Sequence, residues 1–346
     1  IAGGYPLPDA NSLRAGQRAL ELARSVAPDE VVVFLVSGGG SAVMEWPIDG
    51  MASLEEMRQL YRALVACGAD IVTVNTIRKH LSAVKAGRLA LAAGRACAHV
   101  TILLSDVPDR LEAEVASGPS CIDRTTTTDC RRALDNLGLW PHIPPRLADR
   151  LRRDDLPPRF TPDTVGNGVP MIVEYDEIGS NETARASAAH ALRSLGVHSL
   201  DDVASDDWQY ERAAAHLLRR LERLRRRWPS RRVAVVSGGE LSVPLPPNPG
   251  TGGRNQQFVL ACARLIRGQP ITVLSAGTDG VDGNSPAAGA LADGTTMARA
   301  RALGLDVHDA LARCDAFPLL HALGDTIVTG PTGTNVRDLR LLVHAG

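Results

Sequence analysis

The chain has 346 residues, a length that suits two domains better than one. Hydrophobic residues make up 44% of it, which excludes a disordered chain, and a formal net charge of −1 argues against a nucleic-acid-binding protein. No apolar run approaches the roughly 18 residues that a membrane-spanning helix needs, so no membrane partner is expected.

Five apolar segments rich in Val, Ile and Leu each end in a loop of small polar residues. Such runs, separated by helical segments, are typical of buried parallel strands. In chain order the predicted strands are Val31–Val36, His99–Leu104, Arg232–Val236, Ile271–Leu274 and Thr326–Val328. A further strand is expected at Val169–Glu174.

Amphipathic patterns between the strands predict helices. The spacing of Ser53 and Glu56 is that of a capping box at a helix start. The predicted helices are Asn11–Ala27, Ser53–Cys67, Asn181–Leu195, Tyr210–Trp228, Gln256–Ile266 and Thr295–Leu303. The alternation predicts an α/β fold of two domains, each a largely parallel sheet flanked by helices. A break after Trp228 places these domains at 1–228 and 229–346.

Only two of the 38 basic residues are lysines, Lys79 and Lys85. Because Lys is a compact point charge and Arg a planar fork, this usage predicts a site that needs an ammonium group, with coincidence as the alternative. If Asn75–Leu89 forms a helix, Arg78 and Lys85 fall near one face. That face is either a clamp for phosphate or carboxylate, or a solvated surface.

The loops after the five strands are expected at the carboxyl edges of the sheets, where α/β proteins bind ligands. Glycine lets backbone N–H groups converge on an anion and hydroxyls add donors, although glycine also simply makes tight turns. The candidate binding residues are Ser37, Gly38, Gly39, Gly40, Ser41, Ser105, Ser237, Gly238, Gly239, Glu240, Thr278, Gly330, Thr332, Thr334 and Asn335.

Two further segments carry charged candidates. In Gly252–Gln256, Arg254 has the fork that binds a carboxylate or phosphate, with Asn255 and Gln256 as neighbouring ligand-binding candidates. Asp279 and Asp282 are candidate ligands of Mg²⁺, which takes few protein oxygens. The alternative for the two aspartates is a pair of Asx turns.

Several motifs are absent. The sequence has no G-x-x-x-x-G-K-[ST], no G-x-G-x-x-G and no H-E-x-x-H, and Val43 stands where a nucleophile elbow needs glycine. An ordinary P-loop enzyme, a dinucleotide-binding enzyme, a zinc enzyme and a serine hydrolase are therefore disfavoured. The six cysteines form no C-x-x-C pair, which favours free thiols in a reducing cytoplasm.

Taken together and in order, these segments resemble the MOFRL-type (class II) glycerate kinases. The matching stretches are Ser37–Ala42, Asn75–Ala90, Ser105–Pro108, Ser117-Gly118-Pro119, Ser237–Glu240, Gly252–Phe258, Ala276–Gly283 and Gly330–Leu339. The chain begins near the family's G-H-P-x-P-D segment, here Gly4–Asp9, so the family's preceding strand and Gly-Lys-Ala segment are expected to be absent.

The resemblance implies a Rossmann-like first domain, a smaller MOFRL domain and an active site between them. It implies transfer of the γ-phosphoryl of ATP to the 2-hydroxyl of D-glycerate, with Mg²⁺ and with Arg254 close to the chemistry. Lys79 or Lys85 would hold the nucleotide, Lys85 is counted as catalytic, and Asp106 is the candidate base. Two alternatives stay open: a hydroxypyruvate reductase using NAD(P)H, and an inactive nucleotide-binding relative. The regiochemistry and the oligomeric state, with a homodimer as one alternative, also stay open.

Overall fold

The structure is a computed structural model that describes residues 1–161 and 172–346, with only the backbone course described for residues 172–174. The chain folds as two units, Ile1–Ile178 and Gly179–Gly346. The predicted boundary at Trp228 lies inside the second unit, because the helices α9 (Asn181–Ser194) and α10 (Tyr210–Arg227) pack on strands of the second sheet.

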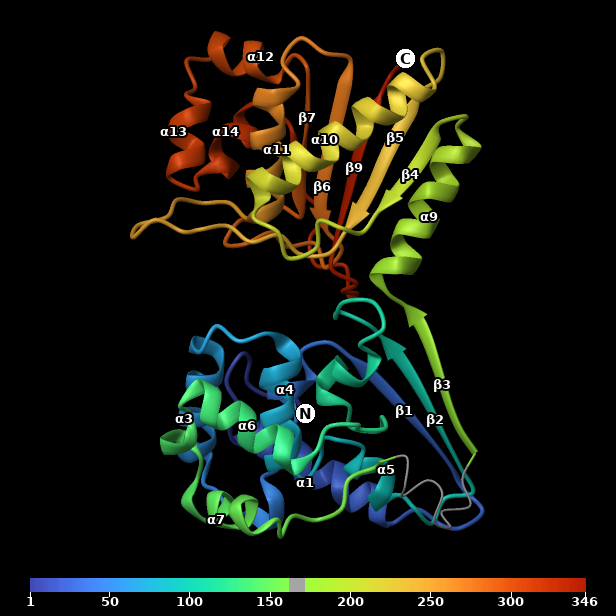
Figure 1. The fold of residues 1–346 in the computed structure, drawn as a ribbon, viewed down its shortest axis with the longest axis vertical. Helices are drawn as coiled ribbons and strands as arrows, with labels where there is room; N and C mark the ends of the chain where they lie inside the picture. The colour runs from blue at the N-terminus through green and yellow to red at the C-terminus, as the bar shows by residue number, and fades with distance from the viewer. Residues whose placement is uncertain (162–171) are drawn as a thin grey trace. The chain divides into compact units, whose positions relative to one another are not determined.

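The first unit contains a three-stranded sheet in the order β1-β2-β3 (Figure 1). Its strands are β1 (Val31–Ser37), β2 (Ala98–Leu104) and β3 (Ile172–Gly179), and β1 pairs with β2 in parallel. The strand predicted at Val169–Glu174 thus continues to Gly179, and its residues 169–171 lie outside the described part. The helices are α1 (Ala10–Arg24), α2 (Gly40–Val43), α3 (Leu54–Ala66), α4 (Ile71–Leu81), α5 (Arg88–Ala92), α6 (Thr127–Leu137) and α7 (Pro145–Arg153), with short 3₁₀ turns at Ile48–Gly50, Glu112–Ser117 and Trp140–His142.

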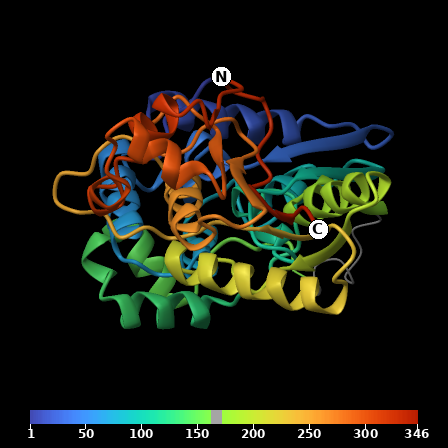
Figure 2. The ribbon, with the colours of Figure 1, turned by 90° about the horizontal axis from the view of Figure 1, so that it is seen from above.

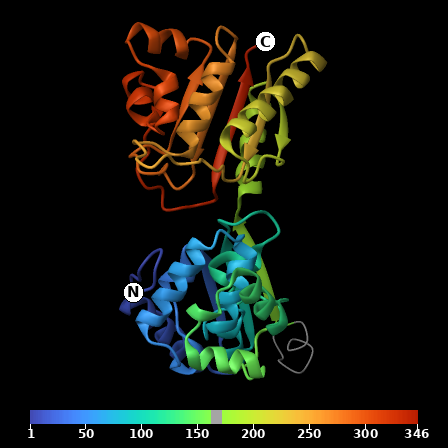
Figure 3. The ribbon, with the colours of Figure 1, turned by 60° about the vertical axis from the view of Figure 1, so that its left-hand side comes forward.

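The helices of the first unit lie against one face of its sheet (Figure 3), and β1 is buried on that face only. Phe34 and Val36 pack inward against helical segments of the unit. Val31, Val33 and Leu35 point the other way and are 55%, 52% and 78% exposed. The expectation that this strand is buried on both faces is therefore wrong, since strand residues alternate between faces and the helices pack on one of them.

The second unit contains a six-stranded sheet in the order β4-β5-β9-β6-β7-β8. Its strands are β4 (His198–Asp202), β5 (Val233–Gly238), β6 (Ile271–Gly277), β7 (Gly289–Asp293), β8 (Thr326–Ile327) and β9 (Asp338–His344). The α/β class is confirmed, but the sheet is mixed and not largely parallel. The predicted strands β5, β6 and β8 share one direction, whereas β7 and β9, which the sequence did not reveal, lie antiparallel between them.

Helices cover both faces of this sheet, and successive side chains of β5 point alternately to the two faces. Val233 and Val235 face the main core with α10 and α11 (Arg254–Leu265), which lie side by side (Figure 2). Ala234 and Val236 face α9 on the other side. Three short helices, α12 (Thr296–Ala302), α13 (Val307–Ala312) and α14 (Ala316–Ala322), complete the main core.

All six predicted helices are present, with bounds shifted by a few residues. The predicted capping box also exists: Ser53 accepts from the backbone of Glu56, whose side chain accepts in return from the backbone of Ser53. In each unit the predicted strands that precede the candidate loops run in the same direction. The loops that follow them therefore lie at one edge of the sheet of that unit.

Candidate active site

The predicted loop Ser37–Ser41 follows β1 and lies against the residues that follow β2. A side-chain carbon at Gly38 would fall 1.8 Å from the Oδ2 of Asp106, so glycine is required for this approach. Gly39 has a φ of 77°, in the left-handed region that glycine adopts without strain. Ser105 is buried and Asp106 half-buried. The structure therefore brings two predicted loops and the candidate base together.

A chain of hydrogen bonds ties this loop to α4. Ser41 Oγ lies 2.7 Å from Ser117 Oγ, and the Ser117 hydroxyl donates to Asn75 Oδ1 at 3.0 Å. The Nη1 of Arg78 donates to the same oxygen at 3.3 Å, and its guanidinium carbon lies 4.8 Å from the centre of the Tyr61 ring. Tyr61 could not be singled out from the sequence, because a buried aromatic at helical spacing is typical of an ordinary core residue.

Lys79 and Lys85 do not face solvent. The Lys79 ammonium lies 2.6 Å from Glu114 and that of Lys85 lies 2.7 Å from Glu45, with the lysine side chains 2% and 0% exposed. Burial lowers the pKa of Lys85. Each ammonium balances a buried carboxylate, so this geometry does not support the prediction that the two lysines hold phosphates or act in catalysis.

A continuous helix over Asn75–Leu89, the condition under which Arg78 and Lys85 would share a face, does not form in its second half. α4 ends at Leu81, and Ser82 adopts extended backbone with φ −108° and ψ 137°. The Ala86-Gly87 pair then has left-handed φ values of 56° and 68°. An α-helix does not tolerate these angles, so Lys85 leaves the helix face that it was predicted to share with Arg78.

In the second unit, Arg254 opens α11 between two carboxylates. Its Nε and Nη2 donate to the two oxygens of Asp338 at 2.6 and 3.1 Å, and its Nη1 donates to Glu240 at 3.1 Å. Although burial opposes the shift, the hydrogen bond and charge of Asp338 raise the pKa of Arg254. The predicted fork is thus held by Asp338, a residue that sequence analysis did not single out.

Asp282 caps the start of α11. Its Oδ1 accepts from the backbone and side-chain amides of Asn255, at 3.0 and 3.2 Å. Its Oδ2 accepts from the same two groups of Gln256, both at 2.9 Å. Burial raises the pKa of Asp282 while these donors oppose the shift. A metal would have to displace four N–H donors, so the predicted roles of Asp282 in metal binding and of Asn255 and Gln256 in ligand binding are not supported.

Asp279 adopts the alternative predicted for it. Its Oδ1 accepts the backbone N–H of Val281 at 3.0 Å, as in an Asx turn. Across residues 1–161 and 172–346, no three His, Cys, Asp or Glu side chains gather as a metal site. Protein ligation of Mg²⁺ in this segment would therefore rest on Asp279 alone.

The loop after β8 folds onto the loop after β6. The Thr332 hydroxyl donates to the Thr278 carbonyl at 2.6 Å, and the Thr332 N–H donates to the Asp279 carbonyl at 3.1 Å. A side-chain carbon at Gly280 would fall 2.0 Å from the carbonyl oxygen of Gly330. The predicted residues of these two loops therefore lie together, with Thr334 and Asn335 in the same loop.

The loop Ser237–Glu240 uses its polar groups internally. The buried Arg340 of β9 donates to the carbonyls of Gly238 and Gly239. The Gly239 N–H, predicted to face an anion, instead donates to Asn181 Oδ1 at 3.0 Å. Ser237 is fully buried. Glu240, which contacts Arg254, is the member of this loop that reaches the candidate site.

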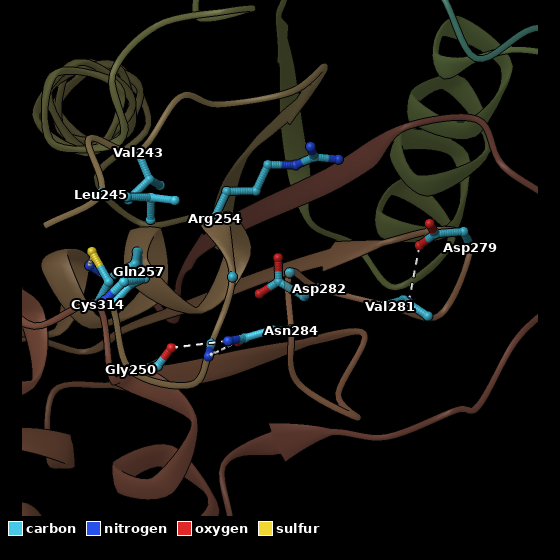
Figure 4. A pocket seen from close by; sticks show the side chains of 14 residues that line it. Val243, Leu245, Gly250, Arg254, Gln257, Asp279, Val281, Asp282, Asn284 and Cys314 are labelled. Carbon is cyan, nitrogen blue, oxygen red and sulfur yellow. Dashed lines mark hydrogen bonds between the residues drawn. The ribbon is translucent and has the colours of Figure 1, made fainter. Parts of the chain in front are cut away.

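A cavity of about 490 Å³ lies beside Arg254 in the second unit (Figure 4). Its polar lining includes Arg254, Gln257, Asp279, Asp282 and Asn284, and its apolar lining includes Val243, Leu245 and Cys314. A volume of this size admits a small-molecule ligand, and the mixed lining is typical of such sites. Three of the predicted residues, Arg254, Asp279 and Asp282, meet at this cavity.

Comparison with known proteins places this fold in a class of phosphotransferases. Residues 1–152 match a family described as a domain of unknown function (DUF4147), and residues 233–338 match the MOFRL family. A D-glycerate 2-kinase of Thermotoga maritima is 36% identical over 97% of this chain and 78% of its own length. A relative from Agrobacterium vitis with the provisional name hydroxypyruvate reductase is 35% identical over 99% of this chain and 87% of its own.

A solved structure agrees with these relatives. The crystal structure of glycerate kinase from Thermotoga maritima superimposes with a TM-score of 0.86 at 33% identity, covering 99% of this chain and 80% of that one. The chain therefore belongs to the glycerate kinase family with DUF4147 and MOFRL domains. None of the helices within the described ranges has the length and apolarity to cross a membrane.

Proposed function

We propose that this chain is a glycerate 2-kinase that transfers the γ-phosphoryl group of ATP to the 2-hydroxyl of D-glycerate. The observation that carries the proposal is the likeness to a solved glycerate kinase over 99% of the chain. The D-glycerate 2-kinase at 36% identity supports the same reaction. ATP is proposed as the donor because a kinase requires a nucleotide.

Phosphoryl transfer depends on positioning and charge neutralisation more than on covalent help. Arg254 is the residue that we assign to the transferred phosphoryl or to the glycerate carboxylate, because Asp338 and Glu240 fix its fork beside the cavity. We assign Asp106 to the glycerate hydroxyl as base, and the Ser37–Ser41 loop to phosphate oxygens.

Magnesium belongs to the same proposal. When bound, Mg²⁺ would neutralise charge on the phosphates, and it takes most of its ligands from phosphate and water. Asp279 is the residue here that suits it, whereas Asp282 is occupied by the N–H donors of Asn255 and Gln256.

A second candidate is a hydroxypyruvate reductase, because one relative carries that provisional name. That reaction needs NAD(P)H, and the sequence contains no G-x-G-x-x-G fingerprint. We expect no loss of NADH absorbance when the protein is mixed with NADH and hydroxypyruvate. A steady loss that scales with protein concentration would favour the reductase.

The decisive experiment is NMR of the product formed from D-glycerate, ATP and Mg²⁺. We expect 2-phosphoglycerate, and 3-phosphoglycerate would correct the position of transfer. Nucleotide binding without product would favour an inactive relative. We also propose a reducing, cytoplasmic location, because all six cysteines are free thiols. Light scattering in solution would test the alternative of a homodimer.

A further inference from the structure

Arg78 is a half-buried cation in the first unit without a carboxylate to balance it. Within the described ranges no Asp or Glu lies at ion-pair distance from its guanidinium, and its Nε is buried with no hydrogen-bond partner. By contrast, Arg254 and Arg337 each form ion pairs with aspartates. A desolvated guanidinium in this state costs free energy unless a ligand satisfies it.

The side chain of Arg78 is nevertheless held in place. Its guanidinium carbon lies 4.8 Å from the centre of the Tyr61 ring, which favours a cation over its face. Its Nη1 donates to Asn75 Oδ1 at 3.3 Å, and the Asn75 amide is oriented by its own bond to the Glu114 carbonyl at 3.1 Å. One of five N–H donors is thus used to orient the fork and the Nε–H is buried, so the remaining N–H groups of Nη1 and Nη2 are the donors that we assign to a ligand.

Tyr61 is itself fixed by the buried pair of Lys85 and Glu45. The Tyr61 hydroxyl contacts Glu45 Oε2 and lies 2.8 Å from the carbonyl oxygen of Ser41. Lys85 donates to the same Glu45 oxygen at 2.7 Å. Tyr61 therefore contacts the Arg78 guanidinium with its ring and the Ser37–Ser41 loop with its hydroxyl. This makes Tyr61 a positioning residue.

A hydroxyl lies at the other end of the hydrogen-bond chain. Because the Ser117 hydroxyl donates to Asn75, Ser41 must be the donor in its 2.7 Å contact with Ser117. Ser41 is half-buried, so rotation of its hydroxyl can redirect that hydrogen to a ligand. The loop thus offers one rotatable donor close to the residues that orient Arg78.

The charges around Arg78 leave it uncompensated. Lys79 is paired with Glu114 and Lys85 with Glu45, so these four groups cancel. The guanidinium of Arg78 adds a positive charge next to the Ser41–Ser117–Asn75 chain. A fork with free N–H groups and a neighbouring hydroxyl recognises the oxygens of a carboxylate or phosphate.

We propose that Arg78 and Ser41 bind an oxyanion of one of the two substrates, with Tyr61 as the positioning residue beneath Arg78. This inference rests on the proposed glycerate kinase activity for its source of ligand. Two sources share the chemistry: the carboxylate of D-glycerate and a phosphate of ATP. The inference concerns the Ser37–Ser41 loop and not the cavity beside Arg254.

The test compares Arg78→Met, Arg78→Lys and Ser41→Ala, with KM for D-glycerate and for ATP measured separately. We expect Arg78→Met to raise one KM at least about tenfold, the loss of one charge-assisted contact, and to leave the other within about twofold. Arg78→Lys keeps the charge but not the fork and should lie between. A rise for D-glycerate identifies the carboxylate and a rise for ATP the phosphate. Unchanged KM values for both substrates would overturn the proposal.

A matched control and a second readout separate this inference from the proposed function. Arg62→Met alters an arginine of α3 whose ion pair with Glu55 is exposed, and it should change neither KM. Thermal stabilisation of the wild type by D-glycerate, ATP or inorganic phosphate requires no turnover. If the wild type is inactive but is stabilised by one of these and Arg78→Met abolishes the shift, the site stands and the kinase function fails. No stabilisation by any of the three would overturn the site itself.

Discussion

The ammonium nitrogen of Lys85 lies 2.7 Å from a carboxylate oxygen of Glu45, and the two side chains are 0% and 1% exposed. The same ammonium reaches the Met44 carbonyl at 3.2 Å and Ser82 Oγ at 3.5 Å. Three donors spread around a point suit these partners, whereas a planar fork does not. The contacts of its ammonium group thus explain why this position holds a lysine in a chain that otherwise uses arginine.

Lys85→Met should destabilise the protein by about 3–5 kcal/mol, because it leaves Glu45 buried without its cation. The double variant Lys85→Met with Glu45→Gln should recover part of that loss, since no unpaired charge then remains. Urea unfolding of the wild type and the two variants measures both effects. Equal midpoints for wild type and Lys85→Met would contradict the buried pair.

Asp282 and Asp279 should respond differently to the same substitution. Asp282→Asn replaces a carboxylate that accepts four N–H bonds at the start of α11, so we expect a loss of about 2–3 kcal/mol in the free energy of unfolding. Asp279→Asn removes one turn contact and should cost less than about 1 kcal/mol.

The dependence of activity on Mg²⁺ distinguishes the two aspartates a second way. If Asp279 is the metal ligand, Asp279→Asn raises the Mg²⁺ concentration needed for half-maximal rate at unchanged stability. Both variants are measured below the melting temperature of Asp282→Asn. If the Mg²⁺ concentration for half-maximal rate rises more in Asp282→Asn than in Asp279→Asn, Asp282 is the metal ligand.

The strands that could be predicted are those in which apolar residues run without interruption, such as β5 (Val233–Gly238). β9 (Asp338–His344) escaped because Asp338 and Arg340 interrupt its pattern, although both are buried in the structure. β7 (Gly289–Asp293) is built of small residues that carry little strand signal. β4 (His198–Asp202), which pairs in parallel with β5, was also missed. Because neither antiparallel strand, β7 or β9, was predicted, the direction of pairing in the second sheet could not be predicted.

Loop positions could be predicted, but the directions of their polar groups could not. Arg254 and Asp338 are 84 positions apart, and Gly239 and Asn181 are 58 apart. Such partners are set by the packing of distant elements and leave no spacing to detect. The composition of a glycine-rich loop therefore indicates where a site lies, while the fold decides which of its N–H groups remain for a ligand.

Acidification should destabilise the first unit through His80. Burial, followed by the charge of Arg159, lowers the pKa of His80 from 6.5 to about 4. Between these pH values the unfolded chain binds a proton that the folded chain does not, so stability falls as the pH is lowered through this window, by up to about 1.4 kcal/mol per pH unit.

His80→Asn tests this assignment. The Asn amide can replace the Nδ1–H that donates to the Thr76 carbonyl at 2.8 Å, and it does not titrate. The slope of stability against pH between about 4 and 6.5 should be smaller in this variant than in the wild type. His99 and His344, whose pKa burial also lowers, leave a residual slope in both proteins. Identical slopes would exclude His80.

Arg254→Lys should lower kcat/KM at least about 30-fold, equivalent to about 2 kcal/mol of lost transition-state stabilisation. A lysine can reach one oxygen of Asp338 but cannot contact both Asp338 oxygens and Glu240 at once, so the group beside the cavity loses its orientation. Steady-state kinetics with D-glycerate and ATP measure the effect.

The chain offers a close structural control in Arg299, whose side chain is also 36% exposed and whose fork also holds a buried aspartate, Asp325. Arg299→Lys should lower the melting temperature about as much as Arg254→Lys does, because both leave a buried carboxylate poorly paired. It should keep wild-type kcat/KM, since Arg299 does not line the cavity. Equal losses of kcat/KM in the two variants would show that activity follows stability, and Arg254 would then be a structural residue.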